Sequence, residues 1–344
     1  MYHLVTGASG FVGSAIVEKL VSKGYKVVSL DIKRDARVEK ISNFYEIDIS
    51  DFSQFKKIRE EITYIHHNAA LVPLTKSGPR YITVNTNGTR NIVNFACERN
   101  ISHLSHMSSS AIFSKKLPNQ NIDTTIYSPI DTYGYSKYLA EIEIIKNLNL
   151  LKFKNITCSI IRPRTIIGEE RLGIFSILFD WVRDNKKIPI IGNGENLFQF
   201  AHISDIVDVS IETALRRKPG FYNIGTDVFD TLKNDLNNFF LEVGSESKIF
   251  TLNQNISKTL LFTLDKLNLS PLSPWHYLSY GNTYYYELKS VFKELEWRPK
   301  YSNKEMLVSS YLHFLNNAKN NNNSNSIHKI NTKQKFLKVI KFFL

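Results

Sequence analysis

A glycine-rich turn between an apolar run and a helical pattern constrains the fold of this chain more than any other segment. Tyr2–Thr6 has the composition of a buried strand, and Phe11–Ser22 has the apolar spacing of a helix. Gly7 and Gly10 lie between them, and Gly13 lies in the first turn of the helix. Glycines here leave room for a tight turn and for a pyrophosphate to approach the N–H groups of a helix N-terminus. The segment therefore predicts a dinucleotide-binding strand–turn–helix unit.

An acidic residue closes the next predicted strand, Lys26–Asp31. A carboxylate at this position accepts hydrogen bonds from the adenosine ribose and repels a 2′-phosphate, so Asp31 favours NAD over NADP. Lys33 and Arg34 follow directly and can turn towards a phosphate. NADP therefore stays open as the alternative cofactor.

Short β-branched runs alternate with longer helical patterns through the first half of the chain. This alternation is typical of a parallel sheet covered by helices, and we expect an α/β fold with a Rossmann-type, doubly wound parallel sheet. We predict strands at Tyr2–Thr6, Lys26–Asp31, Thr63–His67, His103–Ser108 and Ile156–Ile161, and helices at Phe11–Ser22, Phe52–Glu61, Arg80–Glu98 and Tyr133–Asn147.

The pattern becomes less regular after Pro163, with turn signals between short periodic pieces. We therefore expect a dinucleotide-binding Rossmann domain over residues 1–165. Residues 166–315 are predicted to form a smaller, mixed, substrate-binding region that is intergrown with the first. Residues 316–331 are predicted to be an asparagine-rich linker, and residues 332–344 a basic amphipathic tail.

The formal net charge of +12 arises largely from the end of the chain, because six lysines and no acidic residue follow Glu305. The excess elsewhere is modest, so we expect no nucleic acid partner. Cys97 and Cys158 are too few for a disulfide framework, and neither they nor His66 and His67 have metal-ligand spacing. We expect no metal. Because we find no signal-peptide pattern and no apolar run of roughly 20 residues, we expect a cytoplasmic protein.

The tail has apolar residues at helical spacing, with lysines mostly on other faces. This pattern is that of a short interfacial helix, which can make a peripheral contact with an anionic membrane surface. A terminus that docks onto its own domain or onto a partner stays open as the alternative. The apolar residues are Phe336, Leu337, Ile340, Phe343 and Leu344.

Tyr133 and Lys137 stand four positions apart at the start of a predicted helix, so their side chains share one face. A lysine ammonium beside a phenol favours the phenolate, whose pKa is ordinarily about 10. The pair can therefore move a proton to and from an alcohol whose carbon gives up a hydride. Ser108, Ser109 and Ser110 end a predicted strand at the edge where ligands bind, and one of these hydroxyls can bond the substrate oxygen.

These motifs together resemble the extended short-chain dehydrogenase/reductase family, whose NAD-dependent epimerase/dehydratase group includes nucleotide-sugar epimerases, dehydratases and 3β-hydroxysteroid dehydrogenases. The resemblance covers about Met1 to Ser310. It implies an enzyme with NAD as cofactor, a small-molecule substrate, and a homodimer formed by the helices near Arg80–Glu98 and Tyr133–Asn147. The implied cofactor-binding residues are Gly7, Ser9, Gly10, Phe11, Val12, Gly13, Asp31, Asp48, Ile49, Asn68, Ala69, Ala70, Tyr133 and Lys137.

The resemblance also implies a catalytic triad of Ser109, Tyr133 and Lys137, and a structural role for the helix residue Asn85. Ser110 is the alternative catalytic hydroxyl, because the segment after the serines departs from the family's usual ending.

In the dehydratases and decarboxylases of the family, an acidic residue follows the catalytic hydroxyl within two positions. This chain has Ser110 and Ala111 there, so elimination lacks its usual acid and a dehydratase is disfavoured. Two reactions remain open. An epimerase returns the hydride to the other face of a keto intermediate, whereas a dehydrogenase or ketoreductase uses half of that cycle.

The substrate side of the resemblance is mixed. Thr165 and the neutral run Asn196–Phe200 stand where nucleotide-sugar members usually have an asparagine and an arginine, although Arg164, Arg171 or Arg183 can supply the charge. On the breadth of the family, we expect oxidation or epimerisation of a secondary alcohol on a nucleotide sugar. A 3β-hydroxysteroid-dehydrogenase-like or dihydroflavonol-reductase-like enzyme is the alternative. A non-catalytic NAD-binding regulator is a further one, although such proteins usually lose the tyrosine or the lysine.

Overall fold

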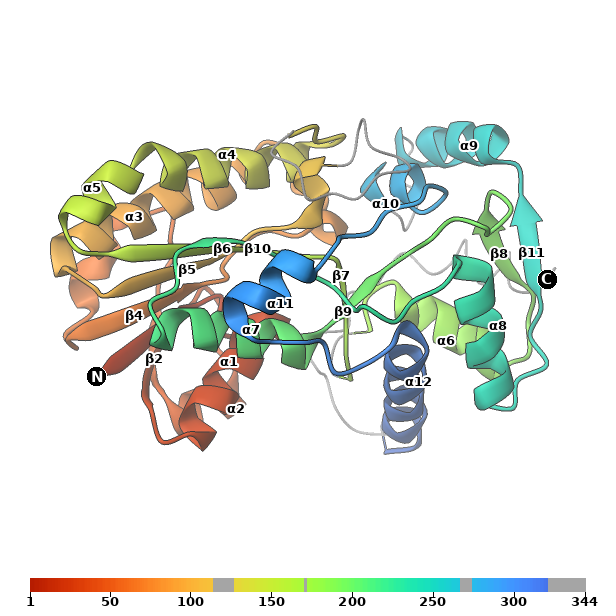
Figure 1. Ribbon diagram of the computed structural model, residues 1–344, viewed down its shortest axis with the longest axis horizontal. Helices are drawn as coiled ribbons and strands as arrows, with labels where there is room; N and C mark the ends of the chain where they lie inside the picture. Colours follow the sequence, from red (N-terminus) through yellow and green to blue (C-terminus); the bar gives the residue numbers. More distant parts are fainter. Residues whose placement is uncertain (114–126, 170–171, 267–273, 321–344) are drawn as a thin grey trace.

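The computed structural model of the protein describes residues 1–113, 127–169, 172–266 and 274–320. Its centre is a seven-stranded sheet of parallel neighbours in the order β10-β6-β5-β4-β1-β2-β3 (Figure 1). This sheet confirms the predicted α/β Rossmann-type fold. Its strands are β1 (Tyr2–Thr6), β2 (Lys26–Asp31), β3 (Asn43–Glu46), β4 (Ile62–His67), β5 (His103–Met107), β6 (Thr157–Pro163) and β10 (Gly220–Ile224).

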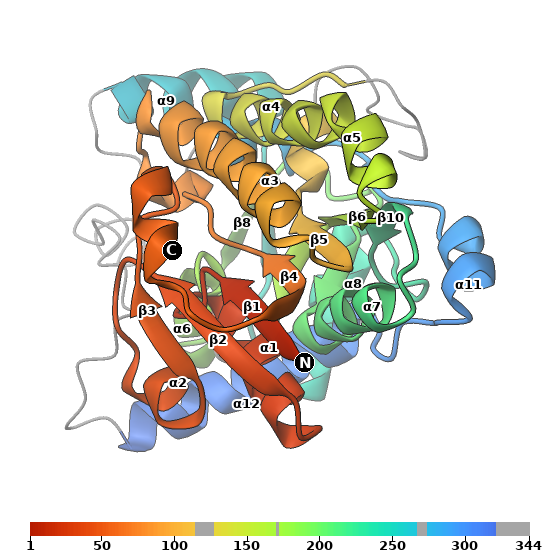
Figure 2. The same cartoon turned by 90° about the vertical axis from the view of Figure 1, so that its left-hand side faces the viewer.

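Helices cover both faces of this sheet (Figure 2). One face carries α3 (Gly88–Arg99), α4 (Thr132–Lys146) and α5 (Leu148–Phe153), and the other carries α1 (Phe11–Ser22), α2 (Ala36–Ile41), α7 (Ile203–Leu215) and α11 (Lys289–Leu295). Side chains alternate between the faces of a strand, so the fully buried Leu4 and Val5 pack into different core clusters. Because helices cover both faces, polar strand residues such as His66, Ser105 and Ser159 are also buried, and each forms a hydrogen bond there.

A smaller part of the molecule lies beyond the carboxyl ends of the strands (Figure 1). It contains two parallel strand pairs, β7 (Thr165–Ile167) with β9 (Phe200–His202) and β8 (Ile188–Ile191) with β11 (Ile249–Leu252). Its helices are α6 (Phe175–Arg183), α8 (Leu232–Glu242), α9 (Gln254–Lys266), α10 (Pro274–Ser279) and α12 (Asn303–Asn320). Aromatic rings form its core, where Phe179 packs against Phe239 and Tyr311 at centroid distances of 6.0 and 5.7 Å.

The two parts share the central sheet. Strand β10 pairs with β6 and helix α7 packs on the sheet, although both follow residue 165 in the chain. Helix α12 runs on to Asn320, past the predicted start of the linker at Asn316, and the rest of the linker and the tail lie outside the described residues. No helix in the described ranges is both long and apolar enough to cross a membrane.

Most strands and helices predicted for the first half lie within two residues of their observed bounds, with three differences. The predicted helix Phe52–Glu61 is wrong, because a 3₁₀ turn ends at Lys57 and Ile58 continues in extended conformation into the core. The predicted helix Arg80–Glu98 is observed as a continuous helix from Arg80, but its residues Ile82–Asn87 are π-helical and α3 begins only at Gly88. Helices α2 and α5 and strand β3 were not predicted, since all three are short.

Candidate functional site

A cavity of about 350 Å³ opens at the carboxyl ends of β1, β4 and β5, on either side of the point where the strand order reverses. The segments that follow these strands supply part of its wall, and the ends of β2, β3 and β6 and the start of α4 supply much of the rest. Of the predicted site residues, Ser9 alone is outside the lining. The others in the wall are Gly7, Gly10, Phe11, Val12, Gly13, Asp31, Asp48, Ile49, Asn68, Ala69, Ala70, Ser109, Tyr133 and Lys137.

The glycine turn is packed so closely that side chains are excluded from two positions. Gly7 has a φ of +66°, and a Cβ built on it would lie 2.7 Å from the Ala69 backbone nitrogen. A Cβ on Gly13 would lie 2.0 Å from the Gly7 carbonyl oxygen. Gly10 is the N-cap of α1, and no side chain caps that end of the helix. The first N–H groups of α1 therefore face a space shaped for an anion.

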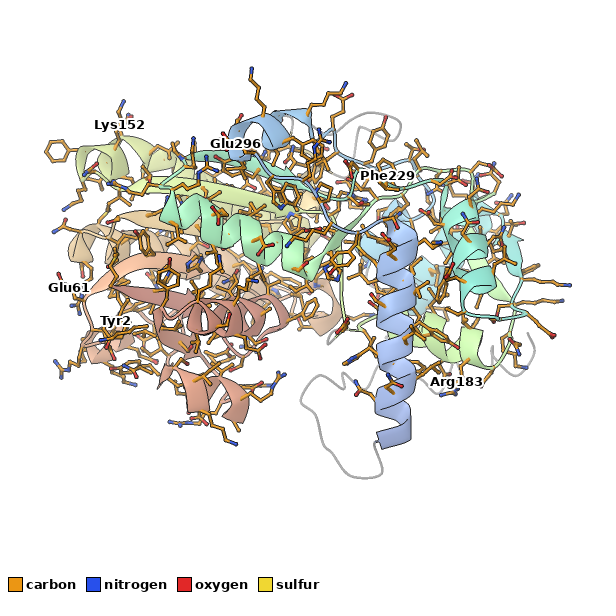
Figure 3. All side chains as sticks on the ribbon, turned by 60° about the horizontal axis from the view of Figure 1, so that its bottom comes forward. Tyr2, Glu61, Lys152, Arg183, Phe229 and Glu296 are labelled. Carbon is orange, nitrogen blue, oxygen red and sulfur yellow. The ribbon has the colours of Figure 1, made fainter. Side chains whose placement is uncertain are left out.

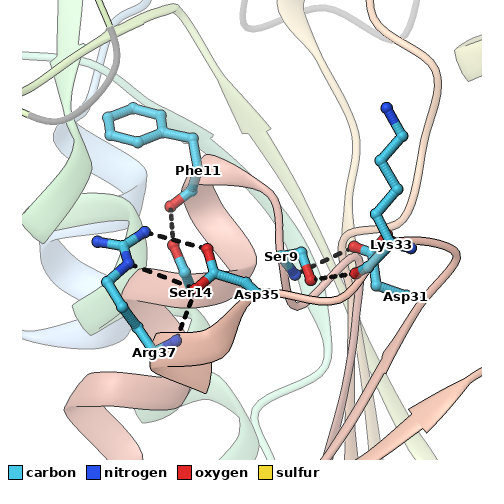
Figure 4. A network of polar contacts seen from close by, with 7 residues as sticks. All are labelled: Ser9, Phe11, Ser14, Asp31, Lys33, Asp35 and Arg37. Atoms are coloured by element: carbon cyan, nitrogen blue, oxygen red, sulfur yellow. Dashed lines mark hydrogen bonds and ion pairs between the residues drawn. The ribbon is translucent and has the colours of Figure 1, made fainter. Parts of the chain in front are cut away.

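Asp31 lies at the end of β2, where two backbone N–H groups hold its carboxylate (Figure 4). Ser9 N donates to Oδ2 at 3.0 Å and Lys33 N to Oδ1 at 3.1 Å, and Ser9 Oγ donates to the Lys33 carbonyl at 2.6 Å. Burial nevertheless raises the pKa of Asp31, because desolvation outweighs these bonds. Ser9 therefore orients Asp31 rather than lining the cavity.

The basic residues beside Asp31 are directed elsewhere. Arg34 forms ion pairs with Glu39 and, at 3.3 Å, with Glu46. The side chain of Lys33 extends away from the Asp31 carboxylate in Figure 4. Further along the wall, Asp48 accepts from Ser50 N at 2.9 Å. The charge that faces the end of β2 in this arrangement is negative.

Tyr133 and Lys137 lie in the first turns of α4 and both line the cavity. Lys137 Nζ donates to the Met107 carbonyl oxygen at 2.6 Å, which places the ammonium at the end of β5. Burial lowers the pKa of Lys137 to about 8, although Glu141 opposes this shift. A Cβ on Gly134 would lie 2.5 Å from the Ala111 carbonyl oxygen. The start of α4 is therefore in direct contact with the turn that carries the serines.

The three serines have different partners. Ser108 Oγ donates to the buried carboxylate of Glu141. Ser110 Oγ accepts from Arg164 Nη1 at 3.0 Å, whereas Ser109 Oγ accepts from the Ala111 backbone N–H at 3.1 Å. The structure thus separates the two candidate hydroxyls, because a charged side chain engages Ser110 and a backbone group engages Ser109.

Asn85 connects the cavity wall to helix α4. Its amide oxygen accepts from Leu71 N at 2.7 Å, while Nδ2 donates to Leu71 O at 3.1 Å and to Ser136 Oγ at 2.9 Å. The π-helical segment carries this side chain, and Asn85 is buried. These contacts make Asn85 a residue that positions the wall, as its predicted structural role requires.

The two arginines of the Arg162-Pro163-Arg164 segment have different surroundings, and only Arg164 was among the cations considered from the sequence. Arg162 donates to both Glu141 oxygens, from Nε at 3.0 Å and from Nη2 at 2.7 Å, in a buried ion pair. Arg164 lines the cavity. The position of Glu141 one turn after Lys137 was the available signal for the ion pair. The third candidate cation, Arg183, lies on α6 at the periphery (Figure 3) and pairs with Asp180 and Asp184. Arg171 lies outside the described residues.

Comparison with known proteins places this site in a family context. Residues 3–225 match the model of the NAD dependent epimerase/dehydratase family. An uncharacterized protein of Sinorhizobium fredii, y4nG, is 31% identical over 342 residues, which make up 99% of this chain and 86% of that protein. A UDP-glucuronate 4-epimerase of Thermodesulfobacterium geofontis is 28% identical over 244 residues, 65% of this chain and 73% of that protein.

Solved structures show the same fold. The UDP-glucose 4-epimerase of Thermotoga maritima, crystallised with UDP-glucose, is similar with a TM-score of 0.74 at 20% sequence identity. The similarity covers 92% of this chain and 100% of that chain.

Proposed function

The chain belongs to the NAD-dependent epimerase/dehydratase family of extended short-chain dehydrogenase/reductase enzymes, and from this premise we propose that it binds NAD and acts on a secondary alcohol of a nucleotide sugar. The observation that carries the proposal is the placement of Tyr133 and Lys137 in the same cavity as the glycine turn. The proposed reaction is a 4-epimerisation or a reduction of the corresponding ketone.

The residues of the cavity fit a dinucleotide. The space beside Gly7 and Gly13, which a Cβ would fill, suits a pyrophosphate held by the N–H groups of α1. Asp31 suits the ribose hydroxyls, and the ion pairs of Arg34 favour NAD over NADP. When bound, NAD supplies the hydride acceptor for the sugar carbon.

The protein side chains move and hold the proton. Tyr133 Oη accepts the proton of the sugar hydroxyl and returns it after the change at carbon, and the Lys137 ammonium favours the phenolate form of Tyr133. Ser109 accepts from the Ala111 N–H, so its own O–H can donate to the same sugar oxygen. The Met107 carbonyl keeps Lys137 in position throughout. Because neither Ser110 nor Ala111 is acidic, we do not favour dehydration.

The substrate proposal draws support from the relatives, one of which is named for a nucleotide sugar. The test is to incubate the pure protein and NAD with UDP-glucose, UDP-glucuronate, TDP-glucose and a 3β-hydroxysteroid, while following reduced cofactor and product stereochemistry. Isomerised sugar without reduced cofactor identifies an epimerase, and accumulating reduced cofactor identifies a dehydrogenase. Turnover of the steroid alone favours the alternative substrate class, and cofactor binding without any turnover favours a regulator.

We also propose a homodimer formed through α3 and α4. Tyr135 of α4 is 48% exposed in the single chain, a large surface for an aromatic residue beside the site. Light scattering measures the mass, and a monomer would contradict this assembly.

The proposed membrane contact of residues 332–344 is tested by flotation on anionic vesicles, with a chain ending at Asn320 as control. Equal flotation of the full chain and the shortened chain would contradict a membrane contact through residues 332–344.

A further inference from the structure

Arg164 is a buried cation in the wall of the candidate site. It follows directly after β6, is 1% exposed, and forms no ion pair with an acidic residue in the described part of the chain. Its Nη1 donates to Ser110 Oγ at 3.0 Å. Its Nε and Nη2 are buried and have no hydrogen-bond partner among the described residues.

The two unpartnered nitrogens lie on the same edge of the guanidinium. Nε and Nη2 together form the side-on fork that matches the two oxygens of a carboxylate. Arg162, two residues earlier, uses this same edge to bind Glu141. One arginine of the segment therefore has its carboxylate within the protein, and the other presents an equivalent edge without one.

The surroundings of Arg164 keep the guanidinium in place without neutralising it. Its central carbon lies 3.8 Å from the ring centroid of Tyr284 and 5.1 Å from that of Phe198. These rings offer a cation–π interaction to the guanidinium, which provides no hydrogen-bond acceptor for Nε or Nη2. Burial lowers the pKa of Arg164, although the group stays charged at neutral pH. A charge that costs folding energy in this way marks a site for a ligand.

The contacts of Arg164 place it near the reacting end of the substrate. It bonds to Ser110, and the neighbouring Ser109 is the proposed catalytic hydroxyl. The next residue, Ala111, has its carbonyl oxygen against Gly134, beside Tyr133. The glycine turn that suits the cofactor pyrophosphate lies in another part of the wall, after β1. An anion bound by Arg164 thus belongs to the substrate.

We propose that Arg164 binds a carboxylate on the reacting sugar, so that the enzyme selects nucleotide-linked uronic acids over neutral hexoses. This inference rests on the proposed function and names the substrate class of the same site. The side-on fork recognises the planar carboxylate through two parallel hydrogen bonds. A neutral hydroxymethyl group in its place leaves one buried donor and the charge without a partner.

The first test uses the unmodified protein with NAD and a matched pair of probes, UDP-glucuronate and UDP-glucose. We expect the acidic sugar to raise the melting temperature more and to have a kcat/KM about 10- to 100-fold higher, as charge-assisted hydrogen bonds typically give. Equal kcat/KM for the two sugars, or a preference for UDP-glucose, would overturn the inference and leave the proposed function intact. If neither sugar is turned over and neither stabilises the protein, both this inference and the proposed function are overturned.

Variants identify the residue responsible. We expect Arg164→Met to lower kcat/KM for UDP-glucuronate by about 10- to 100-fold, mainly through KM, while raising the melting temperature because an unpaired buried charge is removed. Arg164→Lys keeps the charge without the fork and should recover only part of the affinity. Arg298→Met, whose side chain is 74% exposed, is the matched control. If the Arg164→Met variant still prefers UDP-glucuronate to the same extent, another residue recognises the carboxylate and the inference is overturned. If that variant does not fold, Arg164→Lys and the probe pair on the unmodified protein decide the question.

Discussion

The Lys137 ammonium donates a hydrogen bond of 2.6 Å to the carbonyl oxygen of Met107, so a helix side chain is held at the end of a central strand. Lys137 is 3% exposed, and burial lowers its pKa to about 8. The strand end thus determines where the positive charge lies, one turn along α4 from Tyr133. This placement leads to the first two predictions.

Replacing Tyr133 with Phe should lower kcat by about 10²–10⁴-fold, the usual loss when one general acid/base is removed. Cofactor affinity should change little, because the ring that packs against Tyr81 at a centroid distance of 6.0 Å is retained. Steady-state kinetics and a cofactor titration measure the two effects. Full activity of this variant would exclude the proposed mechanism.

Replacing Lys137 with Met should lower activity near pH 7 and leave a residual rate that rises towards pH 10. Without the ammonium, the Tyr133 phenol loses the charge that favours its ionised form, and an unassisted phenol has a pKa of about 10. The measurement is a pH–rate profile of the variant beside that of the unmodified enzyme. Profiles of identical shape would show that Lys137 does not act on the phenol.

Replacing Ser109 and Ser110 one at a time should have different effects on activity and stability. Ser109→Ala should lower kcat by roughly 10²-fold, as expected for one lost donor to the reacting oxygen. Ser110→Ala should affect kcat much less but lower the melting temperature, because it leaves Arg164 Nη1 without its partner. Kinetics and thermal unfolding of the two variants are compared directly. The opposite order of kcat losses would make Ser110 the catalytic hydroxyl.

Cofactor choice is predicted to depend on Asp31. The unmodified protein should bind NAD more tightly than NADP, and Asp31→Asn should narrow the difference by about tenfold or more, because a charged acceptor for the ribose is lost. The amide can still accept from a backbone N–H, as the carboxylate does from Ser9. Titration with both cofactors tests this choice. Tighter NADP binding by the unmodified protein would show that Lys33 or Arg34 outweighs Asp31.

Buried histidines of the central sheet predict a stability that falls in mild acid. Burial lowers the pKa of His3 to about 4 and those of His67 and His103 to about 3. Their pKa in the unfolded chain is about 6.5, so below that pH the unfolded state takes up protons that the folded state does not. These histidines therefore do not change the free energy of unfolding above pH 6.5. Below pH 6.5 they lower it progressively as the pH falls.

The loss approaches roughly 1.4 kcal/mol per pH unit for each such histidine. Urea unfolding at pH 7.5, 6.5 and 5.5 measures it in a range where most carboxylates remain ionised. A constant free energy of unfolding across these three values would contradict the prediction. His103→Gln should reduce the slope, since the amide can still bond Thr157 and Ser159 but does not titrate.

The sequence alone determined those parts of the fold and site whose interactions are local. The glycine turn, the strand before it and the helix after it depend on backbone sterics within a dozen residues, and β1, α1 and β2 have the predicted bounds. Tyr133 and Lys137 share a face because helical geometry requires it. The serines that follow β5 were expected at the edge where ligands bind, because they end a predicted strand of a parallel sheet.

Tertiary packing decided what depends on partners distant in the chain. Arg162 and Arg164 stand two residues apart and look alike in the sequence, yet Glu141 of α4 neutralises only Arg162. The same packing places Ser108 within hydrogen-bond distance of Glu141 and Ser110 within that of Arg164. Ser109 differs from both neighbours because no charged side chain binds it in the described part of the chain. Hydrogen bonds reach only about 3 Å, so the fate of each side chain depends on which remote group the fold brings within that distance. The sequence gives the residue types, but only the three-dimensional structure shows which of these distant residues come into contact.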